Sequence, residues 1–291
     1  MKKILIGCIF LLFFVAGARA QDTIRILAIG NSFSEDAVEN YLYELGRNDG
    51  ITFIIGNLYI GGCSLERHWN NATNDKADYA YRKIGADGLK TVTSNVSLQQ
   101  GISDEKWDYI SLQQNSGNSG QIETYAPYLS DLKAYAKKRS TNREVVFLFH
   151  QTWAYAEDAT HEEFPKYHNN QEEMYRAIVE SSRKAARKAG IRKIVPCGTA
   201  IQNGRNSFLG DVFCRDGYHL SLGLGRYTAA CTWFEYLTGH SVVGNRFIPS
   251  SVIPIEAFVA QRAAHRAVQL PYRITPLLFF LPKANTKNIT G

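Results

Sequence analysis

The sequence predicts an α/β protein in which a mainly parallel, five-stranded sheet lies between two layers of helices. Short apolar runs of strand length alternate along the chain with longer segments of helical periodicity. The apolar runs are nearly continuous, as expected for strands that are buried on both faces. Helices between such strands make right-handed crossovers, so we expect a three-layer α/β/α sandwich.

Five apolar runs have the length and composition of buried strands. They lie at residues 24–29, 53–55 with an extension toward 60, 107–113, 144–149 and 193–196. Four segments have helical periodicity, at residues 37–45, 125–138, 171–189 and 222–237. Ser34 or Asp36 is expected to cap the first helix, and Gly190 and Gly239 are expected to end the last two.

Two regions depart from this alternation. Residues 69–96 have alternating tyrosines and threonines around a glycine-rich turn, which predicts a hairpin insertion. Residues 240–291 form a C-terminal extension with one predicted helix at 256–268 and a proline-containing tail. No repeat or linker composition interrupts residues 21–291, so we expect a single domain.

The first 20 residues have the composition of a secretory signal peptide. Lys2 and Lys3 form a basic start, residues 4–15 are apolar, and residues 18–20 read A-R-A, a typical cleavage site. We therefore expect export to the periplasm or the medium. A lipoprotein signal ending at Cys8 is an alternative, but Cys8 precedes most of the apolar stretch. No later segment is long and apolar enough to span a bilayer.

Composition excludes several classes of protein. The net charge is +6, and removal of the three basic residues in 1–20 leaves 30 basic and 27 acidic residues. A net charge of +3 without long basic runs does not predict nucleic-acid binding. Four cysteines would remain, and their pairing cannot be deduced from sequence. No C-x-x-C pair occurs, so no zinc site is expected, and we expect no metal or cofactor.

Several predicted strands end in polar or glycine-rich segments, where ligands bind in open parallel sheets. These segments are GNS at 30–32, GGCS at 61–64, QQNSG at 113–117 and HQTW at 150–153. A further segment, DGYHLS at 216–221, precedes the last main helix. Together they supply a hydroxyl, glycine N–H groups, amides and a carboxylate–imidazole pair, which are the groups that acyl transfer requires.

Ser32, His219 and Asp216 are the residue types of a catalytic triad. A serine hydroxyl needs a base within hydrogen-bond reach, and the base needs a carboxylate on its other nitrogen to fix its tautomer. Asp216 and His219 lie three residues apart and can meet within one loop. The oxyanion of a tetrahedral intermediate needs N–H donors, which the backbone of Ser32 and Gly62 and the side chain of Asn115 can supply.

In this order, GNSFS, GG, LQQNS and DGYHLS resemble the motifs of the SGNH (GDSL-type) hydrolase superfamily, over residues 24–237. The resemblance implies a flavodoxin-like sandwich, with Ser32 as the nucleophile, His219 as the base and Asp216 as its partner. It also implies an oxyanion hole formed by Ser32, Gly62 and Asn115. The family commonly has Gly-Asp-Ser where this chain has Gly-Asn-Ser, and its third motif is usually G-x-N-D.

Some site residues have alternatives. Gln113 or Gln114 could be the amide donor in place of Asn115, because the glycine of the third family motif is missing here. Gly61 could replace Gly62 by a similar shift of one residue. His150 and Trp153 follow the fourth strand and could line the site; the tryptophan could stack on a sugar or simply cover the sheet edge.

These observations predict an exported serine esterase that hydrolyses an acyl ester, with a carbohydrate O-acetyl ester, either small or polymeric, as the expected substrate. A lipase or acyl-thioesterase of the same fold is one alternative. A non-catalytic glycan-binding protein is another, but a pure binder would not need Ser32, His219 and Asp216 together. Nucleotide binding is not indicated, since neither G-x-G-x-x-G nor G-x-x-x-x-G-K-[ST] occurs.

Overall fold

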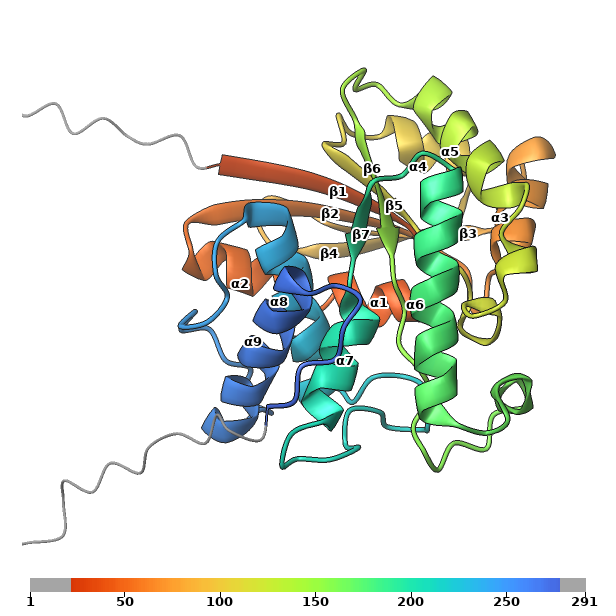
Figure 1. The fold of residues 1–291 in the computed structure, drawn as a ribbon. Coiled ribbons are helices and arrows are strands. Elements are labelled where there is room, and N and C mark those ends of the chain that lie inside the picture. Colours follow the sequence, from red (N-terminus) through yellow and green to blue (C-terminus); the bar gives the residue numbers. More distant parts are fainter. Residues whose placement is uncertain (1–21, 278–291) are drawn as a thin grey trace, which may run out of the picture.

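The computed structural model describes residues 22–277, which form one mixed sheet with helices on both faces (Figure 1). The strands of this part of the chain lie in the order β4-β3-β2-β1-β5-β6-β7. Their bounds are Asp22–Gly30 (β1), Ile51–Tyr59 (β2), Tyr79–Ile84 (β3), Lys90–Val96 (β4), Tyr109–Leu112 (β5), Val146–His150 (β6) and Lys193–Val195 (β7). The predicted α/β/α architecture is confirmed.

The five parallel strands have the order β2-β1-β5-β6-β7, which is the flavodoxin-like arrangement. The hairpin expected within 69–96 consists of β3 and β4, and β3 pairs antiparallel with β2. The predicted number of five strands was therefore wrong, because the hairpin extends the sheet to seven strands. Tyr79 and Tyr81 of β3 are buried in the core, which attaches the hairpin to the sheet.

Nine α-helices are described in residues 22–277. Their bounds are Ser32–Val38 (α1), Leu42–Asn48 (α2), Leu65–Thr73 (α3), Leu98–Ser103 (α4), Tyr128–Arg139 (α5), Gln171–Lys188 (α6), Cys197–Arg205 (α7), Leu224–Thr238 (α8) and Pro254–Gln269 (α9). The sequence did not indicate α3, α4 and α7, which have nine residues or fewer. Such short helices contain too few turns for periodicity to identify them.

The segment expected as one helix at 37–45 is divided into α1 and α2. Tyr41 has a φ of 67°, which lies in the left-handed region and interrupts the helix. Neither Ser34 nor Asp36 is the N-cap, because the helix begins earlier, directly after β1. Asn31 is the cap, and its side-chain oxygen accepts a hydrogen bond from the Phe33 backbone N–H. Ser32 consequently occupies the first position of α1.

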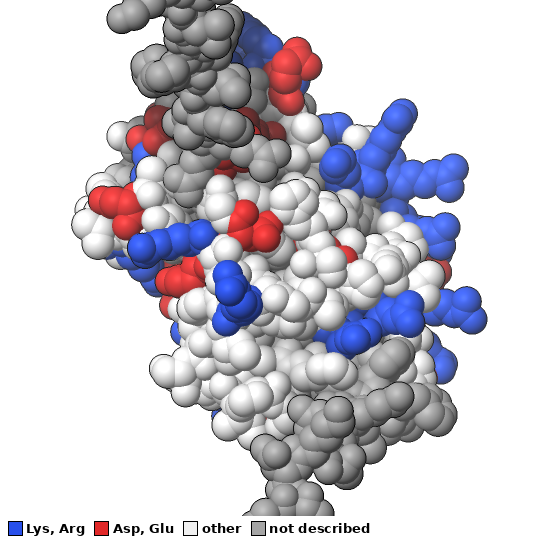
Figure 2. All heavy atoms as spheres, turned by 90° about the vertical axis from the view of Figure 1, so that its left-hand side faces the viewer, with Lys and Arg blue, Asp and Glu red and all other residues white. Residues whose placement is uncertain are grey.

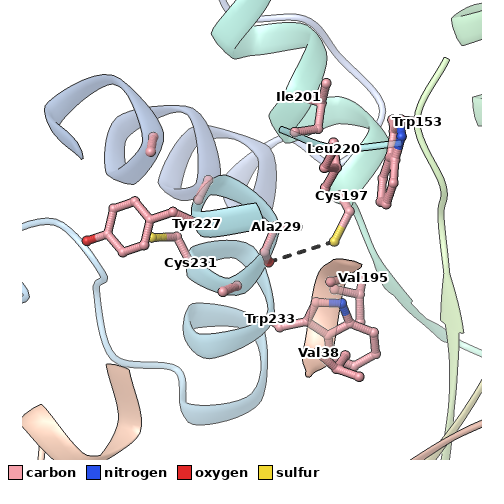
Figure 3. Packing of buried hydrophobic residues seen from close by; sticks show 14 of the residues in the cluster. Val38, Trp153, Val195, Cys197, Ile201, Leu220, Tyr227, Ala229, Cys231 and Trp233 are labelled. Atoms are coloured by element: carbon pink, nitrogen blue, oxygen red, sulfur yellow. Dashed lines mark hydrogen bonds between the residues drawn. The ribbon is translucent and has the colours of Figure 1, made fainter. Parts of the chain in front are cut away.

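The sheet separates two hydrophobic clusters, and alternate residues of β1 face each of them. Ile26 and Ala28 point toward α1, α2, α7, α8 and α9, whereas Leu27 and Ile29 point toward α3, α4 and α5. Helix α6 contributes to both clusters. Figure 3 shows part of the first cluster, where Cys197 of α7 lies beside α8. Burial on both faces explains why the parallel strands read as continuous apolar runs.

The described part of the C-terminal extension packs on the helical layer that contains α7 and α8. Beyond α9, the Thr275 N–H donates to the Asn203 side chain, and the Leu277 N–H donates to the Asn206 carbonyl. No helix of residues 22–277 combines the length and the apolar character needed to cross a membrane. Acidic and basic side chains are both present on the face in Figure 2, with basic ones more numerous on its right-hand flank.

Candidate active site

The candidate site lies where the strand order reverses. β1 and β5 are neighbours, and their crossovers run to opposite sides, which is where ligands bind in open α/β sheets. A cavity of about 380 Å³ opens there. It is lined by Asn31, Ser32, Phe33, Tyr59, Gly61, Gly62, Asn115, Ser116, Gly117, His161, Glu162, Glu163, Tyr218 and His219. Segments after β1, β2 and β5 and two distant loops therefore converge on one space.

Ser32, His219 and Asp216 form a continuous line of hydrogen bonds. The Oγ of Ser32 lies 2.9 Å from Nε2 of His219, and Nδ1 of His219 lies 2.7 Å from Oδ2 of Asp216. Because an ionised carboxylate only accepts, Nδ1 carries the proton and Nε2 is left to accept from the serine. Ser32 and His219 are 187 positions apart in the chain, and the fold brings them within proton-transfer distance.

Asp216 is held as the charged partner by its own loop. Its Oδ1 accepts hydrogen bonds from the backbone N–H groups of Tyr218 and His219, at 3.2 and 2.8 Å. Burial would by itself raise the pKa of this carboxyl group, but the hydrogen bonds from the His219 ring and the two N–H groups outweigh it. The pKa of Asp216 is therefore lower than usual, and the carboxylate can stabilise an imidazolium.

A buried carboxylate fastens the His219 loop to the helix that carries Ser32. Asp36 of α1 is fully buried, accepts from the Leu220 backbone N–H, and forms ion pairs with Arg215 and Arg226. Asp36 was considered in the sequence as a helix cap, but its side chain instead joins α1 to the loop at 215–220 and the first turn of α8. Ser32 and His219 thus share one anchor.

Aromatic rings pack against the His219 loop. Trp153 stacks on Phe33 with 4.2 Å between ring centroids, and its Nε1–H donates to the Tyr218 carbonyl. The Tyr218 ring packs on the His219 imidazole at 4.1 Å. Trp153 is fully buried, so it supports the loop and does not form part of the cavity lining that was considered for it.

Three groups around Ser32 are available as oxyanion donors. Ser32 is the first residue of α1, and its backbone N–H has no acceptor within the helix. Gly62 lines the cavity and has a φ of 61°, a conformation that favours glycine. Asn115 also lines the cavity, and its side-chain Nδ2 is a potential donor. Gly61 lines the cavity as well, so both glycines remain candidates.

The other two amides that the sequence left open lie outside the cavity. Gln113 and Gln114 are at most 2% exposed, and their side chains bond to neighbouring loops. His150, which was also considered as a lining residue, is buried at the end of β6, between the rings of Trp153 and Trp233. None of the three is among the residues that line the cavity. Burial lowers the pKa of His150 to about 3, so its imidazole is neutral.

Several residues of the cavity wall were not foreseen. Tyr59 is the last residue of β2, and Arg82 of β3 lies 3.7 Å above its ring. His161, Glu162 and Glu163 come from the loop before η3 (Phe164–Tyr167). This loop follows β6, but these three residues lie 11 to 13 positions beyond the end of that strand, so a strand-end position did not point to them. Tyr59, two residues before the glycine pair, did have that signal.

The described residues hold neither a cluster of metal ligands nor a disulfide. No three of their His, Cys, Asp or Glu side chains gather closely enough to hold a metal ion. Their four cysteines, Cys63, Cys197, Cys214 and Cys231, are free. Cys63 follows the glycine pair, but burial raises the pKa of its thiol to about 12, so it is not a thiolate nucleophile at neutral pH.

Comparison with known proteins places the chain in a family. A family model described as a domain of unknown function, DUF4886, matches residues 25–267. The crystal structure of a DUF4886 protein from Bacteroides uniformis ATCC 8492 is 54% identical, with a TM-score of 0.87 over 88% of this chain and 98% of that chain. A candidate SGNH hydrolase from Slackia heliotrinireducens is 21% identical, with a TM-score of 0.50 over 74% and 100%. The latter likeness shows a shared fold, and no curated protein matched.

Proposed function

The chain belongs to the DUF4886 family, and we propose that this member is a serine hydrolase that cleaves carboxylic esters. The proposal depends on one observation: Ser32 Oγ is 2.9 Å from His219 Nε2, and His219 Nδ1 is 2.7 Å from Asp216, beside a cavity that Gly62 and Asn115 also line. Such a set activates a hydroxyl for attack on a carbonyl carbon.

The reaction would proceed in two balanced steps. His219 Nε2 takes the Ser32 proton while Oγ bonds to the carbonyl carbon, and the oxyanion accepts hydrogen bonds from Ser32, Gly62 and Asn115. The imidazolium then protonates the departing alcohol, which leaves an acyl-serine. Water repeats the sequence with His219 as its base and releases the carboxylic acid and free Ser32. Asp216 stays ionised throughout and orients the ring.

We place a carbohydrate O-acetyl ester first among the substrates. The cavity is open and polar, and tyrosine rings at positions 59 and 218 stand in its wall, where a sugar could stack. A volume of about 380 Å³ favours a short acyl group over a fatty-acyl chain. Export through the leader is part of the proposal; residues 1–20 lie outside the described residues, and N-terminal sequencing of the mature protein tests it.

Hydrolysis of short-chain aryl esters tests the proposal directly. Ser32→Ala should lower kcat by about 10⁶ without loss of the fold, because the triad acts as a unit. Release of acetate from acetylated polysaccharides then tests the substrate class, with butyryl to palmitoyl aryl esters as the comparison for a lipase or thioesterase. Equal turnover by wild type and Ser32→Ala would refute the mechanism, and tight glycan binding without hydrolysis would favour the non-catalytic alternative.

A further inference from the structure

We propose that Asn31, Gln113 and Gln114 are positioning residues, which hold the oxyanion donors in a fixed mutual geometry through a closed ring of buried hydrogen bonds. The inference rests on the proposed esterase function and extends it to residues that do not touch substrate. Three short segments carry the donors: the nucleophile turn (30–32), the glycine loop (61–65) and the amide loop (113–117).

Each pair of these segments is joined by a side-chain hydrogen bond. Asn31 Nδ2 donates to the Cys63 carbonyl at 3.1 Å, which joins the nucleophile turn to the glycine loop. Gln113 Nε2 donates to Asn31 Oδ1 at 2.9 Å, which joins the amide loop to the nucleophile turn. Gln114 Oε1 accepts from the Leu65 N–H at 3.0 Å, which joins the amide loop to the glycine loop. The three links close a triangle.

The direction of the hydrogen bonds follows from one backbone group. Asn31 accepts from the Phe33 N–H, so the atom it presents there is the amide oxygen. Gln113 must then turn its nitrogen toward Asn31 and its oxygen toward His150, 2.8 Å from Nδ1. His150 therefore carries its proton on Nδ1. Because its pKa is about 3, this arrangement is unchanged at neutral pH.

The ring sits in a dry and crowded part of the molecule. Asn31, Gln113 and Gln114 are each at most 2% exposed, so water cannot replace a lost partner without rearrangement. A Cβ on Gly30 would lie 2.9 Å from Gln113 Oε1 and 2.5 Å from Ser34 Oγ. Glycine before Asn31 therefore allows Gln113 to reach the nucleophile turn.

The donors themselves neighbour the members of the ring. Ser32 follows Asn31, and Gly62 precedes the bonded carbonyl of Cys63. Asn115 follows Gln114, whose Oε1 also accepts the Asn115 backbone N–H at 2.9 Å. Oxyanion stabilisation depends on donors that are already in place when charge develops. A ring that fixes all three segments supplies such preorganisation, whereas a broken ring leaves each segment to move separately.

Steady-state hydrolysis of an aryl acetate by Gln113→Met and Gln114→Met tests the proposal. Methionine has a similar length and removes the hydrogen bonds. We expect kcat to fall by about 10 to 10²-fold, the cost of slight misplacement, with KM within about twofold because substrate contacts remain. The double variant should lose less than the product of the single effects, since one break already opens the ring.

Gln151→Met is the matched control. Gln151 is equally buried, but its side-chain oxygen bonds to Thr199 on α7, away from the three segments. It should lower the melting temperature and leave kcat unchanged. If the variants at 113 and 114 lower kcat no more than this control does, the inference is wrong although the esterase stands. Absence of ester hydrolysis by the wild type would instead refute the proposed function.

Gln113→Glu gives a second readout within one folded protein. The introduced carboxyl group can donate to Asn31 while protonated, and burial raises its pKa. Once ionised, the carboxylate can only accept and no longer donates to Asn31. The activity of the variant should therefore fall reversibly toward alkaline pH, whereas that of the wild type should not. An active variant with the wild-type pH profile would contradict a positioning role.

Discussion

The two halves of the candidate site are built differently. The acid–base half, Asp216 and His219, lies on an irregular loop, and the Asp216 side chain is 42% exposed. The oxyanion half is carried by three segments whose linking side chains are at most 2% exposed. The Asp216–His219 pair itself is closed by hydrogen bonds within four residues, and Asp36 and Trp153 hold its loop from a distance. The oxyanion half has no such local closure and is linked by contacts between residues that are 32 to 82 positions apart.

This difference matches what each half would do in the proposed hydrolysis. The imidazole must accept a proton, carry a positive charge and return the proton, which some exposure to water permits. The oxyanion donors must keep one geometry while charge develops, which a dry and cross-linked frame favours. The predictions below test this division, from the largest expected effect to the smallest.

Removing the base should have the largest effect. His219→Ala is expected to lower kcat by about 10⁶, and its combination with Ser32→Ala should cost little more, because the two residues act as a unit. Single-turnover hydrolysis of an aryl ester measures both. Multiplicative losses in the double variant would show that the two side chains act independently.

Removing one oxyanion donor should cost less. Asn115→Ala is expected to lower kcat by about 10² to 10³. Asn118→Ala is the control, since Asn118 belongs to the same loop region but contacts Lys166 outside the cavity lining. A loss at 115 no larger than at 118, measured with the same ester, would remove Asn115 from the set of donors.

The pH dependence of kcat/KM should show one acid limb with a tenfold loss per pH unit. Protonated His219 cannot accept the serine proton. Asp216 should add no further change in rate near neutral pH, because its pKa is lowered. His150 should add none either, because burial lowers its pKa to about 3. A rate profile that is flat between about pH 5 and 8 would exclude an imidazole base.

The smallest expected effect concerns the free energy of unfolding, which should fall as the solution is acidified. Burial lowers the pKa of His68 to about 3, and the nearby charge of Arg67 adds to this effect. As pH falls, His68 is therefore protonated in the unfolded chain before it is protonated in the folded protein. The stabilisation is present above the unfolded pKa of about 6.5 and is lost as pH falls toward 3, by about 1.4 kcal/mol per unit. Urea unfolding from pH 6.5 to 5 measures this slope, which should be lower by that amount in His68→Asn. Equal slopes would mean that His68 is charged in the folded protein.

The parallel core and the acid–base half were predictable because their signals are local. Buried strands read as apolar runs, and an aspartate three residues before a histidine can close a hydrogen bond within its own loop. The oxyanion frame was not predictable, because Gln113, Gln114 and Asn115 are adjacent polar residues. Only packing decides that the first two turn inward and the third faces the cavity. The hairpin at 69–96 was predicted, but its pairing with β2 was not, because backbone pairing at a sheet edge leaves no signal in the side-chain pattern.

The β3–β4 hairpin contacts a residue of the cavity wall without lining the cavity itself. Arg82 of β3 covers the Tyr59 ring at the cavity and pairs with Glu35 and Glu39, on the outer side of the nucleophile helix and just beyond its end. No residue of the hairpin belongs to the hydrogen-bonded line of Ser32, His219 and Asp216 or to the buried ring. Hairpins of other lengths grafted at this place would change the support of Tyr59 and leave Ser32, His219 and Asp216 in place, which offers a way to vary the cavity wall without altering the candidate catalytic residues.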